Sequence, residues 1–276
     1  MTVENCAVLS DVTGSHYVSL SDTMSKINHR LYRMTRKYFV DVKLHNPSRG
    51  TVVDVYTLNN TWMLDKAVAY ARAAYEKSVK EEKKLLGKQL ARWHDFRLNL
   101  NPSDGNVVAF TALNPMAVNA DNMTPVALTA GDFTNSVSRD EDTNASYAFG
   151  LWEGGSQYNI LKEYEKSGST EDSPDDIEIS APYAAIDDET STTTFVELQE
   201  QGNEPPYDKD NMSDQKLFRH VGQIFTKNDG TQKLSTGNFC APLGLVLLVS
   251  DGGTSGQVCI HMKKGNYKGL ASEAMS

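Results

Sequence analysis

Basic side chains interleaved with tyrosines form the part of this chain with the clearest capacity for chemistry. Lysine and arginine attract phosphates, and tyrosine rings stack on unpaired bases, so the combination is typical of non-specific binding to single-stranded nucleic acid. If about five cations contacted phosphate, affinity would fall with salt with a log–log slope of roughly −3 to −4. The alternative is a plain solvent-facing strand surface. The candidate nucleic-acid-binding residues are Lys26, Arg30, Arg33, Arg36, Lys37 and Lys43, with Tyr32 and Tyr38 between them.

No pattern predicts catalysis. The six histidines are scattered, and neither H-x-x-x-H nor C-x-x-C spacing nor a phosphate-cradling glycine loop occurs. The acid pairs Asp175–Asp176 and Asp187–Asp188 lie in a polar stretch, where carboxylates stay solvated with ordinary pKa values. We therefore expect a protein that is not an enzyme, with no catalytic residues, no cofactor and no metal ligands. Calcium at subunit contacts is a weaker alternative, without assigned ligands.

Cysteine content and hydropathy give two further expectations. Cys6, Cys240 and Cys259 are too few and too far apart for a disulfide framework or a zinc cluster, so we expect reduced thiols, the last two in strands. The apolar run Leu243–Val249 falls far short of the roughly 20 residues that a membrane helix needs, so no membrane insertion is expected.

The distribution of charge is more informative than the formal net charge of −9. Residues 26–49 hold seven Lys or Arg against one acid, Asp41, whereas residues 163–210 hold fifteen acids against two lysines. Such polarity indicates two surfaces with different surroundings, of which the basic one could face a polyanion. Because acidic loops would repel that polyanion, the acidic segment is expected on the opposite, outer surface.

Alternation of apolar and polar residues predicts a strand from Tyr32 to Leu44 with a mostly basic outer face, broken only at Arg36 and Phe39. The turn at 45–50 closes it, and 51–58 forms a second strand. A helix over 25–37 is the competing interpretation, since both apolar and basic residues there also share helical spacing.

A helix is predicted over about 61–94, where Leu64, Val68, Ala71 and Tyr75 begin a stripe that recurs every three or four residues. Asn60 or Thr61 could cap its start. The stripe is expected to be core rather than a partner-binding face. After this helix the apolar runs are short and separated by turn residues, which predicts strands. These runs are 95–100, 106–113, 125–129, 145–152, 194–198, 218–227, 239–249 and 257–262.

The chain is therefore predicted to be mainly β, an antiparallel β-sandwich or single jelly roll of about eight strands with one long helical insertion. Residues 1–25 are expected to form an extended N-terminal arm. Residues 26–276 would form one domain, with an acidic loop excursion at about 164–210.

Three blocks of the sequence resemble capsid proteins of small circular single-stranded DNA viruses, known mainly from environmental samples. The resemblance runs from about residue 38 to the C-terminus and rests on Thr57–Trp62, Ala91–Arg97 and Val258–Gly269. It implies a jelly-roll coat protein of the virion that self-assembles, in about sixty copies, into an icosahedral shell enclosing the genome. It also implies synthesis in the host cell, with the nucleus as the candidate place of assembly, and a host receptor for which no residues are assigned.

One departure from that family concerns the N-terminus. Many relatives begin with an arginine-rich tail, whereas the first 25 residues here contain no Lys or Arg. Neutralisation of the genome would then fall to residues 26–49 and to small cations. The alternatives that stay open are the capsid protein of a small RNA virus and a non-viral β-sandwich that binds a surface or a carbohydrate. An enzyme with a site assembled from distant residues has no supporting pattern.

Overall fold

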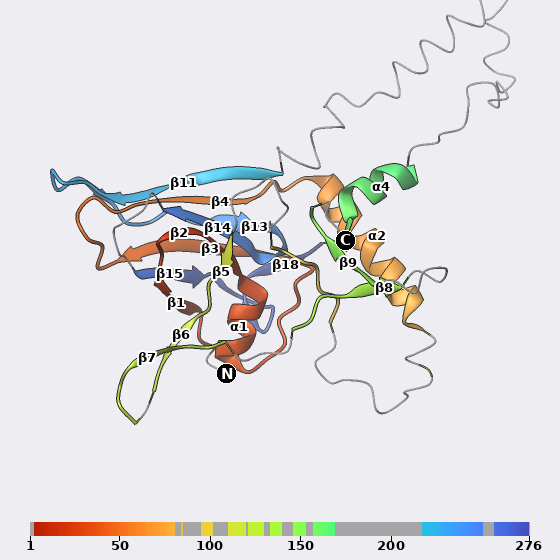
Figure 1. Cartoon of the computed structure of the whole chain (residues 1–276), viewed down its shortest axis with the longest axis horizontal. Helices are drawn as coiled ribbons and strands as arrows, with labels where there is room; N and C mark the ends of the chain where they lie inside the picture. The colour runs from red at the N-terminus through yellow and green to blue at the C-terminus, as the bar shows by residue number, and fades with distance from the viewer. Residues whose placement is uncertain are drawn as a thin grey trace, which may run out of the picture.

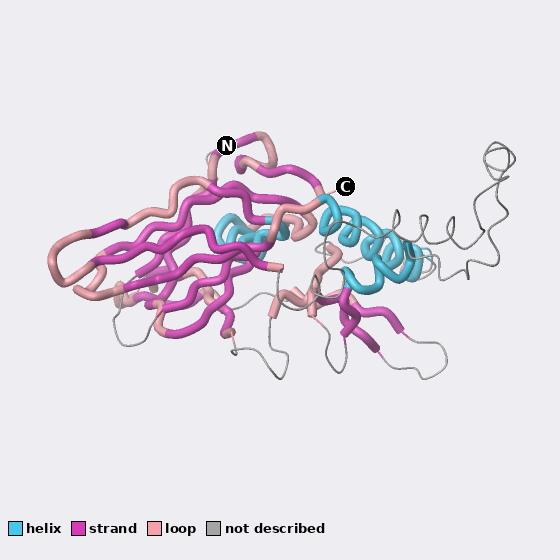
Figure 2. Tube along the Cα trace, turned by 90° about the horizontal axis from the view of Figure 1, so that it is seen from above, coloured by secondary structure: helices cyan, strands magenta, loops and turns pink. Residues whose placement is uncertain are grey.

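The computed structural model shows a body of strands, with one helix beside the strands and others at one end (Figures 1 and 2). It describes residues 3–80, 84, 95–101, 110–119, 121–129, 133–139, 146–152, 157–168, 217–250 and 257–275. Within these residues no helix is long and apolar enough to cross a membrane. The expected strand at 194–198 and nearly all of the acidic excursion lie outside the described residues.

Two antiparallel sheets build the body, and alternation explains why they pack face to face. The first sheet has the order β1-β15-β3-β13, and β18 also pairs with β3. In β3 the side chains of Tyr38, Val40, Val42 and Leu44 are buried, because every second residue faces the opposite sheet. The bounds are β1 (Cys6–Asp11), β3 (Arg36–His45), β13 (Phe239–Ala241), β15 (Gln257–Met262) and β18 (Ser272–Ala274).

The second sheet has the order β12-β11-β4-β14-β2-β5. Its buried side chains, such as Val53, Val55, Val246 and Leu248, join those of β3 in one hydrophobic cluster. Each buried side chain of this size contributes roughly 1.5–3 kcal/mol relative to exposure. The bounds are β2 (Gly14–Ser19), β4 (Val52–Leu58), β5 (Thr111–Ala112), β11 (Phe218–Thr226), β12 (Gln232–Lys233) and β14 (Leu245–Ser250).

The eight principal strands have jelly-roll connectivity, which confirms the predicted fold class. Strands β1, β2, β3 and β4 alternate between the two sheets. Strand β11 then pairs with its predecessor β4, and β13, β14 and β15 alternate again. This is a double sheet of eight strands built from two Greek keys. Helix α1 (Leu20–Asn28) connects β2 to β3, and the long connection between β4 and β11 carries the other helices.

The prediction of an N-terminal arm over residues 1–25 is wrong for the described part of that segment. Strand β1 pairs with β15, β2 pairs with β14, and α1 begins at Leu20. Leu9, Val12 and Val18 are fully or almost fully buried, although the many Ser, Thr and Asp residues around them obscure the periodicity. Helix α1 also partly supports the competing interpretation of a helix near residue 25, while the strand predicted from Tyr32 begins at Arg36.

The apolar run 239–249, predicted as one strand, is two strands in different sheets. Pro242–Gly244 forms a 3-10 turn between β13 and β14, with Leu243 at φ 55° and Gly244 at φ 65°. A Cβ on residue 244 would lie 3.1 Å from both the Leu20 Cβ and the Tyr38 Cδ2. Glycine therefore fits both the left-handed conformation and the close approach at the corner where the chain changes sheet.

The insertion between β4 and β11 contains helix α2 (Trp62–Ser78), and its predicted stripe of Leu64, Val68, Ala71 and Tyr75 is buried as expected. The predicted extension toward residue 94 lies mostly outside the described residues. Helix α4 (Ile160–Gly168) packs beside α2, and Figure 1 shows both helices at one end of the sandwich. Short strands complete the insertion: β6 (Met116–Val118), β7 (Pro125–Ala127), β8 (Val137–Arg139), β9 (Ser146–Gly150) and β10 (Gln157–Asn159).

Helix α2 offers a test of its N-terminal cap. The Thr61 Oγ1 accepts a hydrogen bond of 3.3 Å from the Leu64 backbone N–H. We expect Thr61→Ala to lower the free energy of unfolding by about 1 kcal/mol, because a helix N–H loses its partner. Urea denaturation measures this, and Thr61→Ser, which keeps the hydroxyl, should stay close to the parent chain. An equal loss in both variants would contradict the capping role.

Candidate nucleic-acid interface

A short basic hairpin leaves the first sheet where the pairing of β3 is interrupted. Met262 pairs with Val40 and Ser272 pairs with Tyr38, so residues 263–271 form an excursion opposite Phe39. The Lys263 N–H donates to the Phe39 carbonyl at 2.9 Å, and the Ala271 N–H donates to the Lys263 carbonyl at 2.7 Å. Strands β16 (Lys264–Gly265) and β17 (Gly269–Leu270) form the arms of this hairpin.

The hairpin turn needs glycine at residue 269. Gly269 has φ 94°, and a Cβ there would lie 2.7 Å from the Val3 Cγ2. Both the conformation and the packing therefore exclude a side chain. The tight turn holds Lys264 and Lys268 exposed and Tyr267 partly buried against the core.

Tyr267 of the hairpin contacts several residues of the 30–36 segment. The Arg36 guanidinium carbon lies 3.8 Å from the Tyr267 ring centroid, and the Tyr32 ring meets Tyr267 edge-on at 6.1 Å. The Tyr267 hydroxyl accepts a hydrogen bond of 3.1 Å from the Arg33 backbone N–H. The 30–36 segment and the C-terminal hairpin, which are far apart in the sequence, are therefore joined through one aromatic ring.

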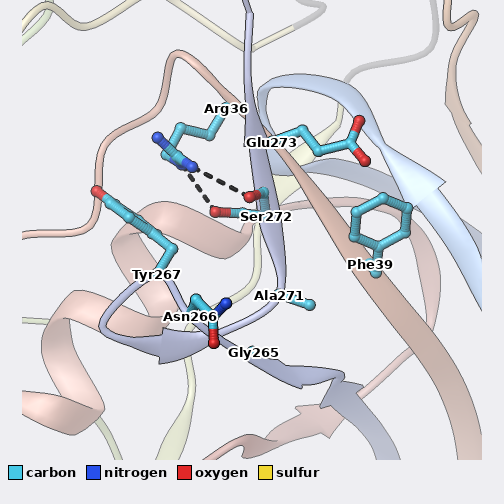
Figure 3. Close-up of a pocket in the computed structure, with 8 residues that line it drawn as sticks. All are labelled: Arg36, Phe39, Gly265, Asn266, Tyr267, Ala271, Ser272 and Glu273. Atoms are coloured by element: carbon cyan, nitrogen blue, oxygen red, sulfur yellow. Dashed lines mark hydrogen bonds between the residues drawn. The ribbon is translucent and has the colours of Figure 1, made fainter.

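Arg36 is held in a fixed orientation beside Tyr267 (Figure 3). Its Nε donates to the Ser272 Oγ at 2.7 Å, and its Nη2 donates to the Ser272 carbonyl at 3.0 Å. This explains why Arg36 breaks the alternation: it lies on the core-facing side of β3, at the strand's first residue, and turns toward β18. A guanidinium held in place loses less conformational entropy when it binds a ligand.

The pKa of Lys268 is affected by the positive charges around it. Its pKa is lowered chiefly by partial burial and then by the charge of Arg33, with Arg30 and Arg36 adding to the effect, while Asp95 opposes it. Its Nζ donates a hydrogen bond to the Leu31 carbonyl. The three arginines therefore disfavour the charged form of Lys268, and an anion bound beside it would relieve the repulsion. We call Arg30, Arg33, Arg36, Tyr267 and Lys268 the basic cluster.

A shallow pocket of about 500 Å³ opens beside the basic cluster. Figure 3 shows Arg36 and Tyr267 on one side of β18 and Phe39 with the Glu273 carboxylate on the other. Cations next to aromatic rings suit a phosphate and the face of an unpaired base. The lining residues are Arg36, Phe39, Gly265, Asn266, Tyr267, Ala271, Ser272 and Glu273.

The structure brings together only half of the six residues proposed from the sequence. Arg30, Arg33 and Arg36 belong to the basic cluster, whereas the three lysines lie elsewhere. Lys26 donates to the Asn114 Oδ1 at 2.9 Å. The Lys37 Nζ lies 2.6 Å from the Asp65 Oδ2 with its side chain 11% exposed, and the Lys43 Nζ lies 3.6 Å from the Asp41 Oδ2. Alternation in β3 places Lys37 and Lys43 on the outer face of the sheet, away from Arg36.

Sequence reasoning missed the hairpin residues Lys263, Lys264, Tyr267 and Lys268. The signal was present, because three lysines and a tyrosine fall within the run 263–268. This run follows the last long strand, and only the fold brings it next to Arg33 and Arg36.

A second grouping of reactive side chains lies on the outer face of the first sheet. The Cys6 Sγ is 3.7 Å from the His261 Nε2, and the Cys6 and Cys259 thiols are hydrogen-bonded. Across the described ranges, however, no three His, Cys, Asp or Glu side chains converge as metal ligands would. All three cysteines carry free thiols, and Cys240 and Cys259 lie in strands as expected.

Burial raises the pKa of the Cys259 thiol to about 11, and the neighbouring Cys6 adds to the shift. Because only the thiolate reacts, we expect alkylation of Cys259 at pH 8 to be roughly a hundredfold slower than in the urea-unfolded chain. The rate should rise with pH until the thiol ionises. Timed iodoacetamide labelling with peptide mass spectrometry measures both rates, and equal rates would contradict the assigned environment.

Comparison of the chain with protein-family models, with curated protein sequences and with solved structures gave no match.

Proposed function

We propose that this protein is a viral coat protein that self-assembles into a closed icosahedral shell around a single-stranded genome. The basic cluster and the adjoining pocket contact the genome without requiring a particular nucleotide sequence. We propose no catalytic role, and the outer shell surface is formed by elements remote from the cluster.

The fold is one that coat proteins use, but it does not by itself identify a coat protein. Eight-stranded jelly rolls occur in viral capsids, in lectins and in cupins, so architecture leaves several functions open. In a closed shell every copy uses the same patches, and loops and insertions become contacts between subunits.

The observation that carries the proposal is the placement of Arg36 and Lys268 beside the Tyr267 ring, whose hydroxyl accepts a hydrogen bond from the Arg33 backbone N–H. Phosphates would neutralise cations that otherwise repel one another, and an unpaired base could stack beside Arg36. A carbohydrate-binding surface would also use an aromatic ring, but it would gain little from the cations of Arg36 and Lys268 beside that ring. Paired bases are stacked within a duplex, so the pocket favours a single strand.

Expression of the full chain followed by negative-stain imaging tests the proposal. We expect uniform spherical particles whose ultraviolet spectrum shows packaged nucleic acid. A non-viral binding module would instead give single chains or small oligomers. A monodisperse small species that binds no single-stranded oligonucleotide would overturn the proposal.

A further inference from the structure

We infer that the pocket beside the basic cluster selects a nucleobase bearing an exocyclic amine, and that it prefers cytosine to thymine. Glu273 is the residue that makes this choice. The inference rests on the proposed binding of single-stranded nucleic acid and adds a base preference to it.

The walls of the pocket suit a flat ring. Arg36 is fixed by two hydrogen bonds to Ser272 and lies against Tyr267 on one side of β18, and Phe39 lies with Glu273 on the other side (Figure 3). Phe39 is only partly buried, since the excursion of residues 263–271 interrupts strand pairing beside it. A base that lies beside Glu273 can stack on the Phe39 ring, while Arg36, on the other side of β18, can contact the phosphate of the same strand.

The pocket also contains a charged side chain that can distinguish one base from another. Glu273 is exposed, and within the described residues its carboxylate makes no hydrogen bond or ion pair, since Lys37, opposite it on β3, pairs with Asp65. An ionised carboxylate only accepts hydrogen bonds, and it repels phosphate. Arg33, Arg36 and Lys268 lie on the other side and can bind the phosphate. The Glu273 carboxylate is therefore free to accept a hydrogen bond from the edge of the base.

Cytosine and thymine differ at the atom that the carboxylate would meet. Cytosine presents the N4 amine, a donor that Glu accepts, whereas thymine presents the O4 carbonyl, an acceptor that the carboxylate repels. Because Glu273 is exposed, the difference falls at the low end for such contacts. We expect about threefold to tenfold tighter binding of cytosine.

Glu273→Gln separates selection from general binding. The glutamine amide can donate to thymine O4 or accept from cytosine N4, so the preference should fall to about one. Affinity for both oligonucleotides should rise, because one negative charge near the phosphates is removed. Glu76→Gln removes the same charge on α2, where Glu76 pairs with Arg72 at 2.9 Å, and should leave the preference unchanged.

Fluorescence anisotropy with oligo-dC and oligo-dT of about ten nucleotides measures these affinities. The full-length chain is used at pH 7.5 and at concentrations where sedimentation shows unassembled subunits. A preference for oligo-dC that disappears only in Glu273→Gln supports the inference. Equal affinities in the parent chain, or a preference that survives Glu273→Gln, overturn it while leaving the proposed function intact. Absence of binding to either oligonucleotide overturns both.

Discussion

Arg97→Met is expected to lower the free energy of unfolding by about 3–5 kcal/mol, because it removes one member of a buried ionic network and leaves the carboxylates behind. The Arg97 side chain is 3% exposed. Its Nη1 donates to Asp22 and to the Ser21 Oγ, and its Nη2 donates to the Tyr32 carbonyl at 3.1 Å. Its Nε lies 3.6 Å from the Asp95 Oδ2.

The loss should depend on pH in a defined direction. Burial already raises the pKa of Asp95, and the Arg97 charge opposes that rise. Without Arg97 the pKa of Asp95 climbs further, so its ionised form destabilises the folded chain as pH rises through that value. The destabilisation by Arg97→Met should therefore be smaller at pH 4 than at pH 7.

Urea denaturation at both pH values measures this effect. Arg72→Met is the matched control, since the Arg72 side chain on α2 is 37% exposed and its pair with Glu76 contributes at most about 1 kcal/mol. Equal losses in the two variants would show that the Arg97 network is not a main support of the fold. Arg97 also bonds Tyr32, so its loss should loosen the segment that carries Arg30 and Arg33.

Replacing Arg30, Arg33, Arg36 and Lys268 together with Gln is expected to reduce the salt dependence of single-strand binding by about 3 in log–log slope. At about 0.1 M salt the affinity should fall roughly a hundredfold or more, since each lost phosphate contact contributes about 0.7 to the slope. Titration of the unassembled chain with a labelled oligonucleotide at several salt concentrations measures both quantities.

The matched control changes Lys66, Lys77, Lys80 and Lys84 to Gln. These lysines are exposed on α2 or shortly after it, and their replacement removes the same total charge. We expect only a small, long-range change in affinity, because exposed charges beyond a Debye length are screened. A similar fall in both variants would mean that net charge, rather than the basic cluster, drives binding.

Hydrophobic periodicity was enough to predict the mainly β class, the strand through Val40 and Val42, and the start of α2. It could not reveal that Leu9 and Val18 belong to core strands, because polar neighbours mask a burial that depends on pairing with β14 and β15. It also could not divide 239–249, since both halves are apolar and only the corner at Leu243 and Gly244 separates them.

Only part of the candidate site could be predicted from the sequence, because the rest depends on how the sheet is assembled. Arg30, Arg33 and Arg36 were identified from local charge density, but local density does not distinguish them from Lys37 and Lys43. The two lysines lie on the outer face of β3 and Arg36 lies on the other face. Lys37 pairs with Asp65, and Lys43 pairs with Asp41. Tyr267 and Lys268 join the site through sheet topology, which places the C-terminal hairpin beside the 30–36 segment.

A three-dimensional reconstruction of particles purified after expression of the full chain is the most direct test of the proposed coat function. We expect closed shells with the basic cluster on the inner surface and nucleic-acid density against Arg36 and Tyr267. Shells with the cluster on the outer surface, or an inner surface formed by α2 and α4, would contradict the proposed contact with the genome. A chain that forms no closed particle would contradict the coat function itself.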